Sequence, residues 1–169
     1  IGEAPILWHI MKLYSQHGFN DFVLCLGYKG RMIKEFFMEY EWDIFDFSMN
    51  LRTKEQSWHR THELEDWNIT FANTGELTQT GGRVAAIRKY IGDNDFMLTY
   101  GDGVGDIDLN ALYEFHKQQG KMVTITCVHP VSKFGIVQLT KANKVAFVEK
   151  PPLKDWISGG FMVCKPEFF

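Results

Sequence analysis

The sequence predicts an α/β fold in which a mixed, mainly parallel sheet is flanked by helices, with a β-rich portion toward the C-terminus. Short continuous apolar runs, typical of strands buried on both faces, alternate with segments of helical periodicity over the first three-quarters of the chain. After residue 128, short strand-like runs follow one another through turns that leave no room for helices. The length of 169 residues suits a single domain with one core.

Four segments carry an apolar stripe at helical spacing and are expected to form helices, namely residues 5–17, 31–40, 81–91 and 109–119. Pro5 suits the first turn of the first helix, and Gly18 suits its C-terminal stop. Asp108 stands where the fourth helix needs an N-cap. His116 in that helix is expected on a face that meets solvent.

Strands are expected at the apolar runs 21–27, 43–50, 67–74, 95–100 and 122–128, and later at 134–140, 144–150 and 158–164. A polar loop over 52–66 is expected between the second and third of them. His59 and His62 in this loop have a His-x-x-His spacing, but no cysteine or glutamate stands at ligand spacing, which disfavours a zinc site.

The composition excludes several classes of protein. Hydrophobic residues make up 45% and charged residues 23%, as in ordinary globular proteins. The net charge is −3 and the 18 basic residues are scattered, which argues against a nucleic-acid partner. No apolar run approaches the roughly 20 residues that span a bilayer, so no membrane partner is expected. Cys25, Cys127 and Cys164 each lie in an apolar run and are expected to be buried free thiols, which favours a cytoplasmic location.

Gly101-Asp102-Gly103 follows the strand expected at 95–100. In open α/β sheets, ligands bind beyond the carboxyl ends of the strands. A carboxylate at such a position suits Mg²⁺, which typically takes one or two carboxylates together with substrate phosphates. The glycines would let a ligand approach the backbone closely. These residues also leave open an ordinary turn facing solvent, and Asp106 is undecided between a ligand role and a place beside the next helix.

The stretch TQTGGRV (78–84) sets two glycines at the expected start of a helix. Backbone N–H groups at such a place can meet an anion or a base edge, and Arg83 adds a planar fork suited to phosphate. The stretch lacks the Gly-Lys-Ser/Thr ending of a P-loop, and a flexible loop is the alternative interpretation.

Further candidates lie in the β-rich portion. Glu149 and Lys150 are adjacent, so on a strand they would point to opposite faces, one of them toward a pocket. An edge-strand charge pair is the alternative. Gly160 and Gly135 raise the same question of close approach by a ligand.

Taken together, these stretches resemble the sugar nucleotidyltransferases, and among them most closely the glucose-1-phosphate cytidylyltransferases. The resemblance runs nearly from end to end, through PILWHIM, GYKG, IKEFF, WNITFANTG, TGGRV, TYGDGVGDID, FG, EKP and GGF. It implies a Rossmann-like, GT-A-like nucleotidyltransferase fold with a sugar-binding portion toward the C-terminus. It also implies a reaction of CTP with α-D-glucose 1-phosphate, dependent on Mg²⁺, that gives CDP-glucose and pyrophosphate for surface polysaccharide synthesis.

The resemblance also implies roles for individual residues. The catalytic residues it implies are Asp102, Arg83 and Lys150. Asp102 would hold the Mg²⁺, with Gly101 against the nucleotide, while Lys150 would neutralise the sugar phosphate and Glu149 would accept hydrogen bonds from sugar hydroxyls. The residues implied on the nucleotide side are Thr78, Gly81, Gly82 and Arg83, and those on the sugar-phosphate side are Gly135, Glu149, Lys150, Ser158 and Gly160. Ser158 stands where the family commonly has Asn.

The family's N-terminal Gly-rich loop would precede Ile1, and its second metal-binding Asp and its oligomerisation segment would follow Phe169. We therefore expect residues 1–169 to be one nucleotidyltransferase domain that is incomplete at both ends and inactive by itself. The whole enzyme is expected to be a homo-oligomer. Two alternatives stay open: a sister transferase that uses dTTP or UTP, and a non-catalytic regulatory domain that binds nucleotide sugars.

Overall fold

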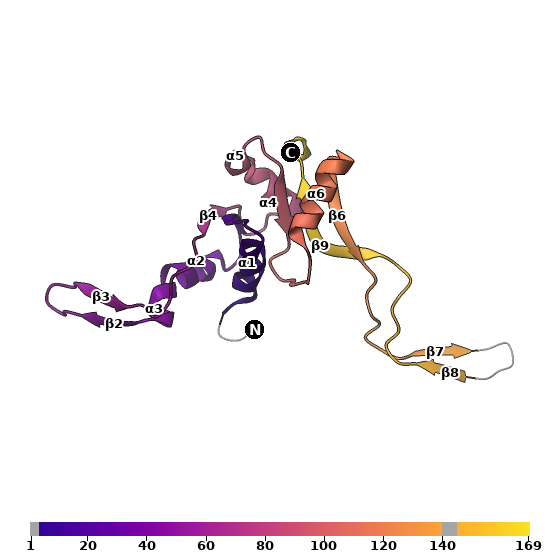
Figure 1. Ribbon diagram of the computed structural model, residues 1–169, viewed down its shortest axis with the longest axis horizontal. Coiled ribbons are helices and arrows are strands. Elements are labelled where there is room, and N and C mark those ends of the chain that lie inside the picture. The colour runs from indigo at the N-terminus through magenta and orange to yellow at the C-terminus, as the bar shows by residue number, and fades with distance from the viewer. Residues whose placement is uncertain (1–3, 140–144) are drawn as a thin grey trace. The chain divides into compact units, whose positions relative to one another are not determined.

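The computed structural model describes residues 4–139 and 145–169, and the chain divides into two compact units. One unit comprises Tyr14–Gly92 with Phe169, and the other comprises the residues up to Leu13 together with Asp93–Phe168. The helix expected over 5–17 is confirmed as α1 (Ile6–Gln16). The boundary between the two units falls within this helix, after Leu13. Each unit has its own strands (Figure 1), and each contributes buried hydrophobic side chains.

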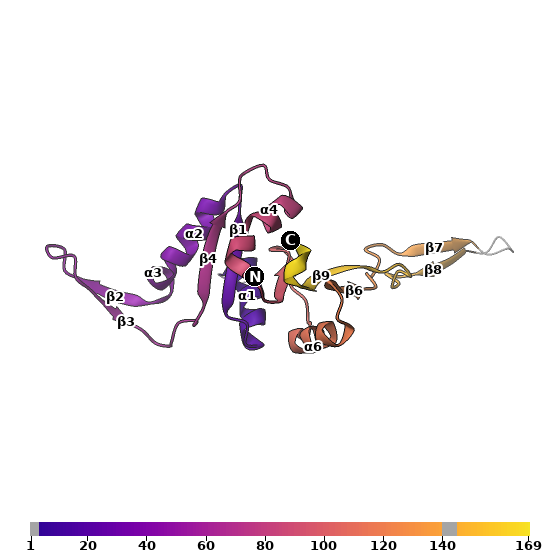
Figure 2. The same ribbon diagram turned by 90° about the horizontal axis from the view of Figure 1, so that it is seen from above.

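The unit of Tyr14–Gly92 is built on two parallel strands, β1 (Asp21–Leu26) and β4 (Asn68–Asn73), which lie side by side in Figure 2. Their apolar runs supply buried side chains to the core, namely Leu24, Leu26 and Ala72. After β4 come α4 (Thr80–Ala86) and α5 (Arg88–Ile91), where the sequence predicted a single helix. Ile87 stands between them; its backbone, at φ −97° and ψ −1°, lies away from ideal α-helical angles, and its side chain is buried.

The segment between β1 and β4 holds α2 (Gly30–Met38), α3 (Tyr40–Ile44), β2 (Asp46–Met49) and β3 (Gln56–His59). The prediction of a polar loop over 52–66 is wrong, because β3 pairs antiparallel with β2 in a hairpin that extends beyond α3 (Figure 1). The strands of this hairpin carry few aliphatic residues, and contacts between aromatic rings stabilise it instead. The ring centroids of Phe47 and Trp58 are 4.9 Å apart, and those of Trp42 and Phe47 are 5.2 Å apart.

The other unit holds a three-stranded sheet of β5 (Phe96–Thr99), β9 (Ile157–Cys164) and β6 (Val123–Val128), with β9 in the middle and antiparallel to both neighbours. The strand expected at 95–100 is half-buried rather than buried. Helix α6 (Leu109–Gln119) is confirmed with its N-cap, because Asp108 Oδ1 accepts a hydrogen bond from the Ala111 N–H at 2.9 Å.

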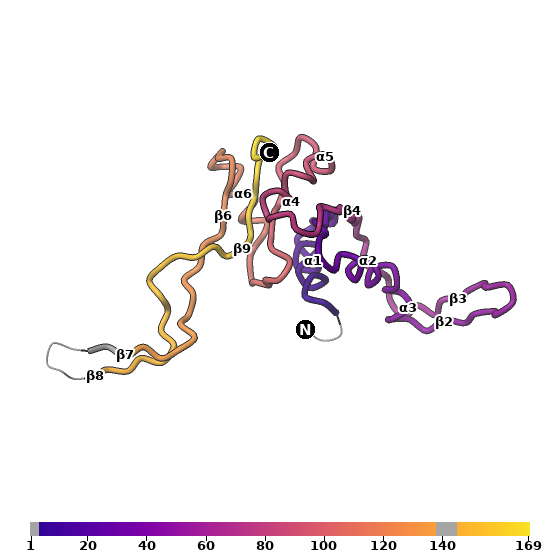
Figure 3. Tube along the Cα trace, turned by 180° about the vertical axis from the view of Figure 1, so that it is seen from behind, coloured from indigo at the N-terminus to yellow at the C-terminus, as the bar shows by residue number. Residues whose placement is uncertain are grey.

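Between β6 and β9 the chain runs out to a second hairpin, β7 (Ile136–Leu139) and β8 (Val145–Val148), and then returns, as the trace in Figure 3 shows. A 3₁₀ turn (Pro166–Phe168) follows β9. The strands expected here are thus confirmed over the described residues; positions 140 and 144 of those predictions lie outside them. No helix in the described part of the chain has both the length and the apolar character needed to cross a membrane.

The environments predicted for three residues are wrong. His116 is fully buried, and its Nδ1 lies 2.8 Å from Thr124 Oγ1, while its Nε2 lies 3.9 Å from Asp95 Oδ2. Cys164 is buried as expected, but Cys127 is exposed and Cys25 is only half-buried. Cys127 lies beyond a shift in the β6–β9 register, where β6 pairs with the exposed start of β9, and Ile125 before the shift is exposed too.

Candidate functional site

Arg83 lies across the carboxyl ends of β1 and β4. Its Nη1 donates a hydrogen bond to Thr74 Oγ1 at 2.8 Å, and its Nη2 donates to the carbonyl oxygen of Glu76 at 3.1 Å. The guanidinium covers Gly27, where any Cβ would overlap both terminal nitrogens. The sequence identified Arg83 but missed Thr74. The signal available was the position of Thr74 at the end of the strand predicted over 67–74.

The loop that leads into α4 closes around Thr78. Gly75 has φ +94°, a conformation that favours glycine, and a Cβ there would lie 2.6 Å from Thr78 Oγ1. A Cβ at Gly82 would lie 2.9 Å from the Thr78 methyl group. The structure therefore brings Thr78 and Gly82 together with Arg83 in one unit. Gly81 lies at the exposed start of α4.

Asp102 and Gly101 lie exposed in the loop that follows β5. Tyr100, just before them, packs on Gly160 of β9, where a Cβ would lie 3.1 Å from the Tyr100 ring. Gly160 has φ +84°, and its N–H donates to Ser158 Oγ at 3.3 Å. The structure therefore places Gly160 and Ser158 beside the start of the Asp102 loop, through Tyr100, a residue that sequence reasoning did not single out.

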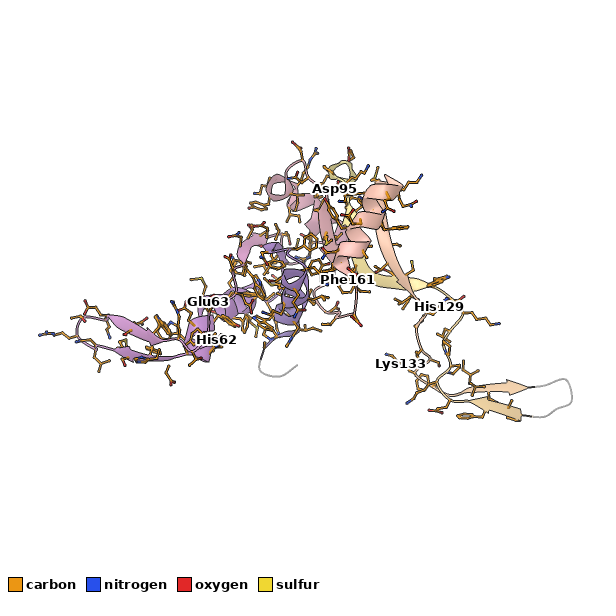
Figure 4. The ribbon with its side chains drawn as sticks, in the orientation of Figure 1. His62, Glu63, Asp95, His129, Lys133 and Phe161 are labelled. Carbon is orange, nitrogen blue, oxygen red and sulfur yellow. The ribbon has the colours of Figure 1, made fainter. Side chains whose placement is uncertain are left out.

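The far side of the same loop also rests on β9. A Cβ at Gly105 would lie 3.2 Å from the ring of Phe161, which Figure 4 labels on that strand. At the register shift, Thr126 Oγ1 donates to the Phe161 carbonyl oxygen at 3.0 Å and accepts from its N–H at 3.3 Å. The hydroxyl thus supplies the partners that the irregular ladder lacks, and it holds the part of β9 on which the Asp102 loop rests.

Glu149 and Lys150 lie in the bend after β8, so the expectation that they point to opposite faces of a strand is wrong. The ladder ends at Val148, and the two side chains approach each other, with Lys150 Nζ 3.9 Å from Glu149 Oε1. Both are more than half exposed, at 61% and 63%. Gly135 lies at the base of the same hairpin, against the ring of Phe147. No contact recorded among the described residues joins this turn to Asp102.

The candidate metal ligands do not gather into one large cluster in the part of the chain that the structure describes. Across residues 4–139 and 145–169, no group of three or more His, Cys, Asp or Glu is arranged to hold a metal ion. His59 Nε2 instead lies 2.9 Å from Ser48 Oγ, and the ring of His62 lies 4.8 Å from that of Phe45 at the base of the β2–β3 hairpin (Figure 4). Asp102, exposed between two glycines, offers one carboxylate, which fits a divalent cation held mainly by substrate phosphates.

The sequence matches a known family and several curated proteins along its length. The family described as "Nucleotidyl transferase" matches residues 1–169. The chain is 42% identical over 168 residues to the glucose-1-phosphate cytidylyltransferases of Salmonella typhimurium and Salmonella typhi. The match covers 98% of this chain and 65% of each relative, so the chain spans about two thirds of the length of these curated relatives.

A solved structure shows the same fold. HddC from Yersinia pseudotuberculosis, complexed with GMP-PN, superposes with a TM-score of 0.61 at 18% sequence identity. The superposition covers 97% of this chain and 64% of that chain. It confirms the predicted α/β, GT-A-like fold class.

Proposed function

The chain belongs to the nucleotidyl transferase family, and from that premise we propose that the whole protein transfers the cytidylyl group of CTP to α-D-glucose 1-phosphate. The products are CDP-glucose and pyrophosphate. The observation that carries this proposal is the 42% identity, over 98% of the chain, to two glucose-1-phosphate cytidylyltransferases. The alternatives that use UTP or dTTP belong to the same family, and the identity favours CTP over them.

The reaction needs positioning and charge neutralisation more than covalent help from the protein. An oxygen of the sugar phosphate forms a bond to the α-phosphorus of CTP, and the bond from that phosphorus to the bridging oxygen breaks. Pyrophosphate leaves with the electron pair. Groups that hold the two substrates in line, and cations that balance the phosphate charge, therefore supply the rate enhancement.

Arg83 is the proposed contact to the nucleotide. Its guanidinium is held over Gly27 by the bonds to Thr74 and Glu76, so it is set in place before a ligand arrives. Asp102 would hold the divalent cation that this family generally uses, proposed here as Mg²⁺, which neutralises triphosphate charge when bound. Gly101 beside it allows a nucleotide to approach the backbone.

The sugar phosphate is proposed to meet Lys150, whose exposed ammonium can neutralise it, while Glu149 accepts hydrogen bonds from sugar hydroxyls. The close pairing of the two side chains is compatible with both roles, because an exposed ion pair at 3.9 Å is weak and exchanges readily for ligand contacts. Ser158 and Gly160, beside the Asp102 loop, complete the proposed sugar side.

Pyrophosphate release by the full-length protein, measured with glucose 1-phosphate and with CTP, UTP or dTTP in turn, tests the proposal. Release with CTP at a rate well above the other two is the expected result, and equal rates with all three would defeat the assignment of the base. Binding of CDP-glucose without any pyrophosphate release would instead identify a regulatory domain.

A further inference from the structure

Thr74 lies buried, at 8% exposure, directly after β4 and between the strand pair and Arg83. Its backbone N–H and its hydroxyl both donate to the carbonyl oxygen of Leu26, each at 2.9 Å. Its Oγ1 also accepts from Arg83 Nη1 at 2.8 Å. Because a guanidinium only donates and a carbonyl only accepts, the single hydroxyl proton must point to Leu26. The order of donation, from Arg83 to Thr74 to Leu26, is therefore fixed.

Two further contacts restrict the guanidinium. The carbonyl oxygen of Glu76 accepts from Nη2 at 3.1 Å, and Gly27 provides the space that the planar group occupies. A guanidinium has five N–H donors. The two bonds recorded among the described residues use two of them, which leaves donors for a ligand. Arg83 is therefore held as part of the protein framework and still has hydrogen-bonding capacity.

We propose that Thr74 is a positioning residue for the nucleotide: it fixes the Arg83 guanidinium in the orientation in which its remaining donors meet the nucleoside triphosphate. The inference rests on the proposed function, which supplies that ligand. An arginine that is ordered before binding loses less rotamer freedom when the ligand arrives, so the hydroxyl of Thr74 contributes to affinity without touching the nucleotide. The sugar phosphate, which meets other residues, gains nothing from it.

The test compares two substitutions in the full-length protein. Thr74→Val keeps the shape of the side chain and removes the hydroxyl, whereas Thr74→Ser keeps the hydroxyl. Thr74→Val should raise the KM for CTP by roughly tenfold or more, since a hydrogen bond to a charged group is lost. The KM for glucose 1-phosphate should stay within about twofold of wild type, and Thr74→Ser should restore the KM for CTP. Thr70→Val, the same change at a half-buried position on β4, which Thr74 follows, is the matched control.

A second variant displaces the guanidinium from the other side. Gly27→Ala places a methyl group where the guanidinium lies, and the flexible end of Arg83 would move away from it. It should therefore reproduce the higher KM for CTP. The double variant Thr74→Val/Gly27→Ala should be no worse than the more affected single variant, because both act through Arg83.

The outcomes separate the two proposals. If wild type releases pyrophosphate with CTP, or instead with UTP or dTTP, the variants are measured with that nucleotide. A lower melting temperature of Thr74→Val with an unchanged nucleotide KM would then show a purely structural role and overturn the inference. An equal rise in KM for both substrates, or additive effects of the two substitutions, would also overturn it. If wild type neither binds nor uses any of the three nucleotides, the proposed function fails, and the role of Thr74 fails with it.

Discussion

The Arg83 cluster in one unit and the Asp102 loop in the other differ in how far the protein's own contacts fix the functional group. Arg83 is bonded to Thr74 and Glu76 and covers Gly27. The Asp102 carboxylate is exposed between glycines, and the contacts recorded for the described residues include none to it. The first group is thus set by the fold before any ligand binds, whereas the second keeps its freedom.

The loop around Asp102 is nevertheless supported, but at its ends. Tyr100 rests on Gly160 and Gly105 rests against Phe161, so two consecutive residues of β9 carry the loop. This arrangement sets the position of the loop and leaves the carboxylate free to meet a cation. It follows that substitutions at Asp102 should separate activity from stability, whereas substitutions at Arg83 should affect both.

Asp102→Asn gives the largest expected effect. Pyrophosphate release should fall by at least about 100-fold, since a group that helps to balance transition-state charge is lost. The melting temperature should stay close to wild type, because an exposed surface substitution usually changes stability by less than about 0.5 kcal/mol. Asp106→Asn, in the same exposed loop, is the control and should keep most of the activity. If Asp102→Asn also lowered the melting temperature strongly, Asp102 would be part of the folded framework, as Arg83 is, and the two regions would not differ.

Arg83→Ala should lower both quantities. The nucleotide KM should rise by about tenfold or more, and the free energy of unfolding should fall by about 1–2 kcal/mol, because two hydrogen bonds and the packed aliphatic stem are lost. Arg88→Ala, on the exposed face of α5, controls for the loss of a positive charge. Urea unfolding and steady-state kinetics measure the two effects. If Arg83→Ala were as stable as Arg88→Ala, the Arg83 cluster would be no more fixed by the fold than the Asp102 loop.

Gly160→Ala tests the support of the Asp102 loop. An L-residue at φ +84° costs about 1–2 kcal/mol, and the new Cβ would press on the Tyr100 ring at 3.1 Å. Unfolding in urea should show that loss of stability, together with a several-fold lower rate of pyrophosphate release. Gly103→Ala is the control, since Gly103 does not have a positive φ and no heavy atom lies within 4 Å of its added Cβ. A stable, fully active Gly160→Ala protein would mean that the loop does not depend on β9.

Much of the framework could be predicted because local pattern decides it. The apolar runs that became β1 and β4, and the capped helix after Asp108, need no information from distant residues. His116 shows a signal that was present but misread. It stands seven residues after Leu109, on the same helical stripe, and its polarity suggested solvent. Its burial is explained by Thr124, which lies on the next strand and bonds to its Nδ1.

The candidate residues could be proposed from the sequence one at a time, but the contacts that support them could not. Arg83 is held by Thr74 and Gly27, and Gly27 is 56 residues away along the chain, so their meeting depends on the parallel pairing of β1 with β4. The strand β3 was missed for a related reason, because its polar sequence is stabilised by pairing and by aromatic contacts across the hairpin.

The smallest expected effect is a difference in the reactivity of the cysteines. Their labelling reports on the two units without a substitution in either. Burial raises the pKa of the Cys25 thiol, more than the charge of Arg83 lowers it, and burial raises the pKa of Cys164 to about 11. A thiolate reacts and a thiol does not, so at pH 8 roughly one Cys164 in a thousand is reactive. A maleimide should therefore modify exposed Cys127 first, with Cys25 and Cys164 at least about tenfold slower.

The raised pKa of Cys164 determines how its contribution to the stability of the fold changes with pH. The folded protein keeps the proton of Cys164 at pH values where the unfolded chain releases it. The buried thiol therefore contributes stability that is fully present below about pH 8.5 and is lost as the pH rises toward 11. Maleimide labelling followed by mass mapping at pH 7 and pH 9 checks the order in which the three cysteines are modified. Labelling of Cys25 as fast as Cys127 would show that the β1 edge beneath Arg83 opens readily, against the fixed geometry on which the role of Thr74 depends.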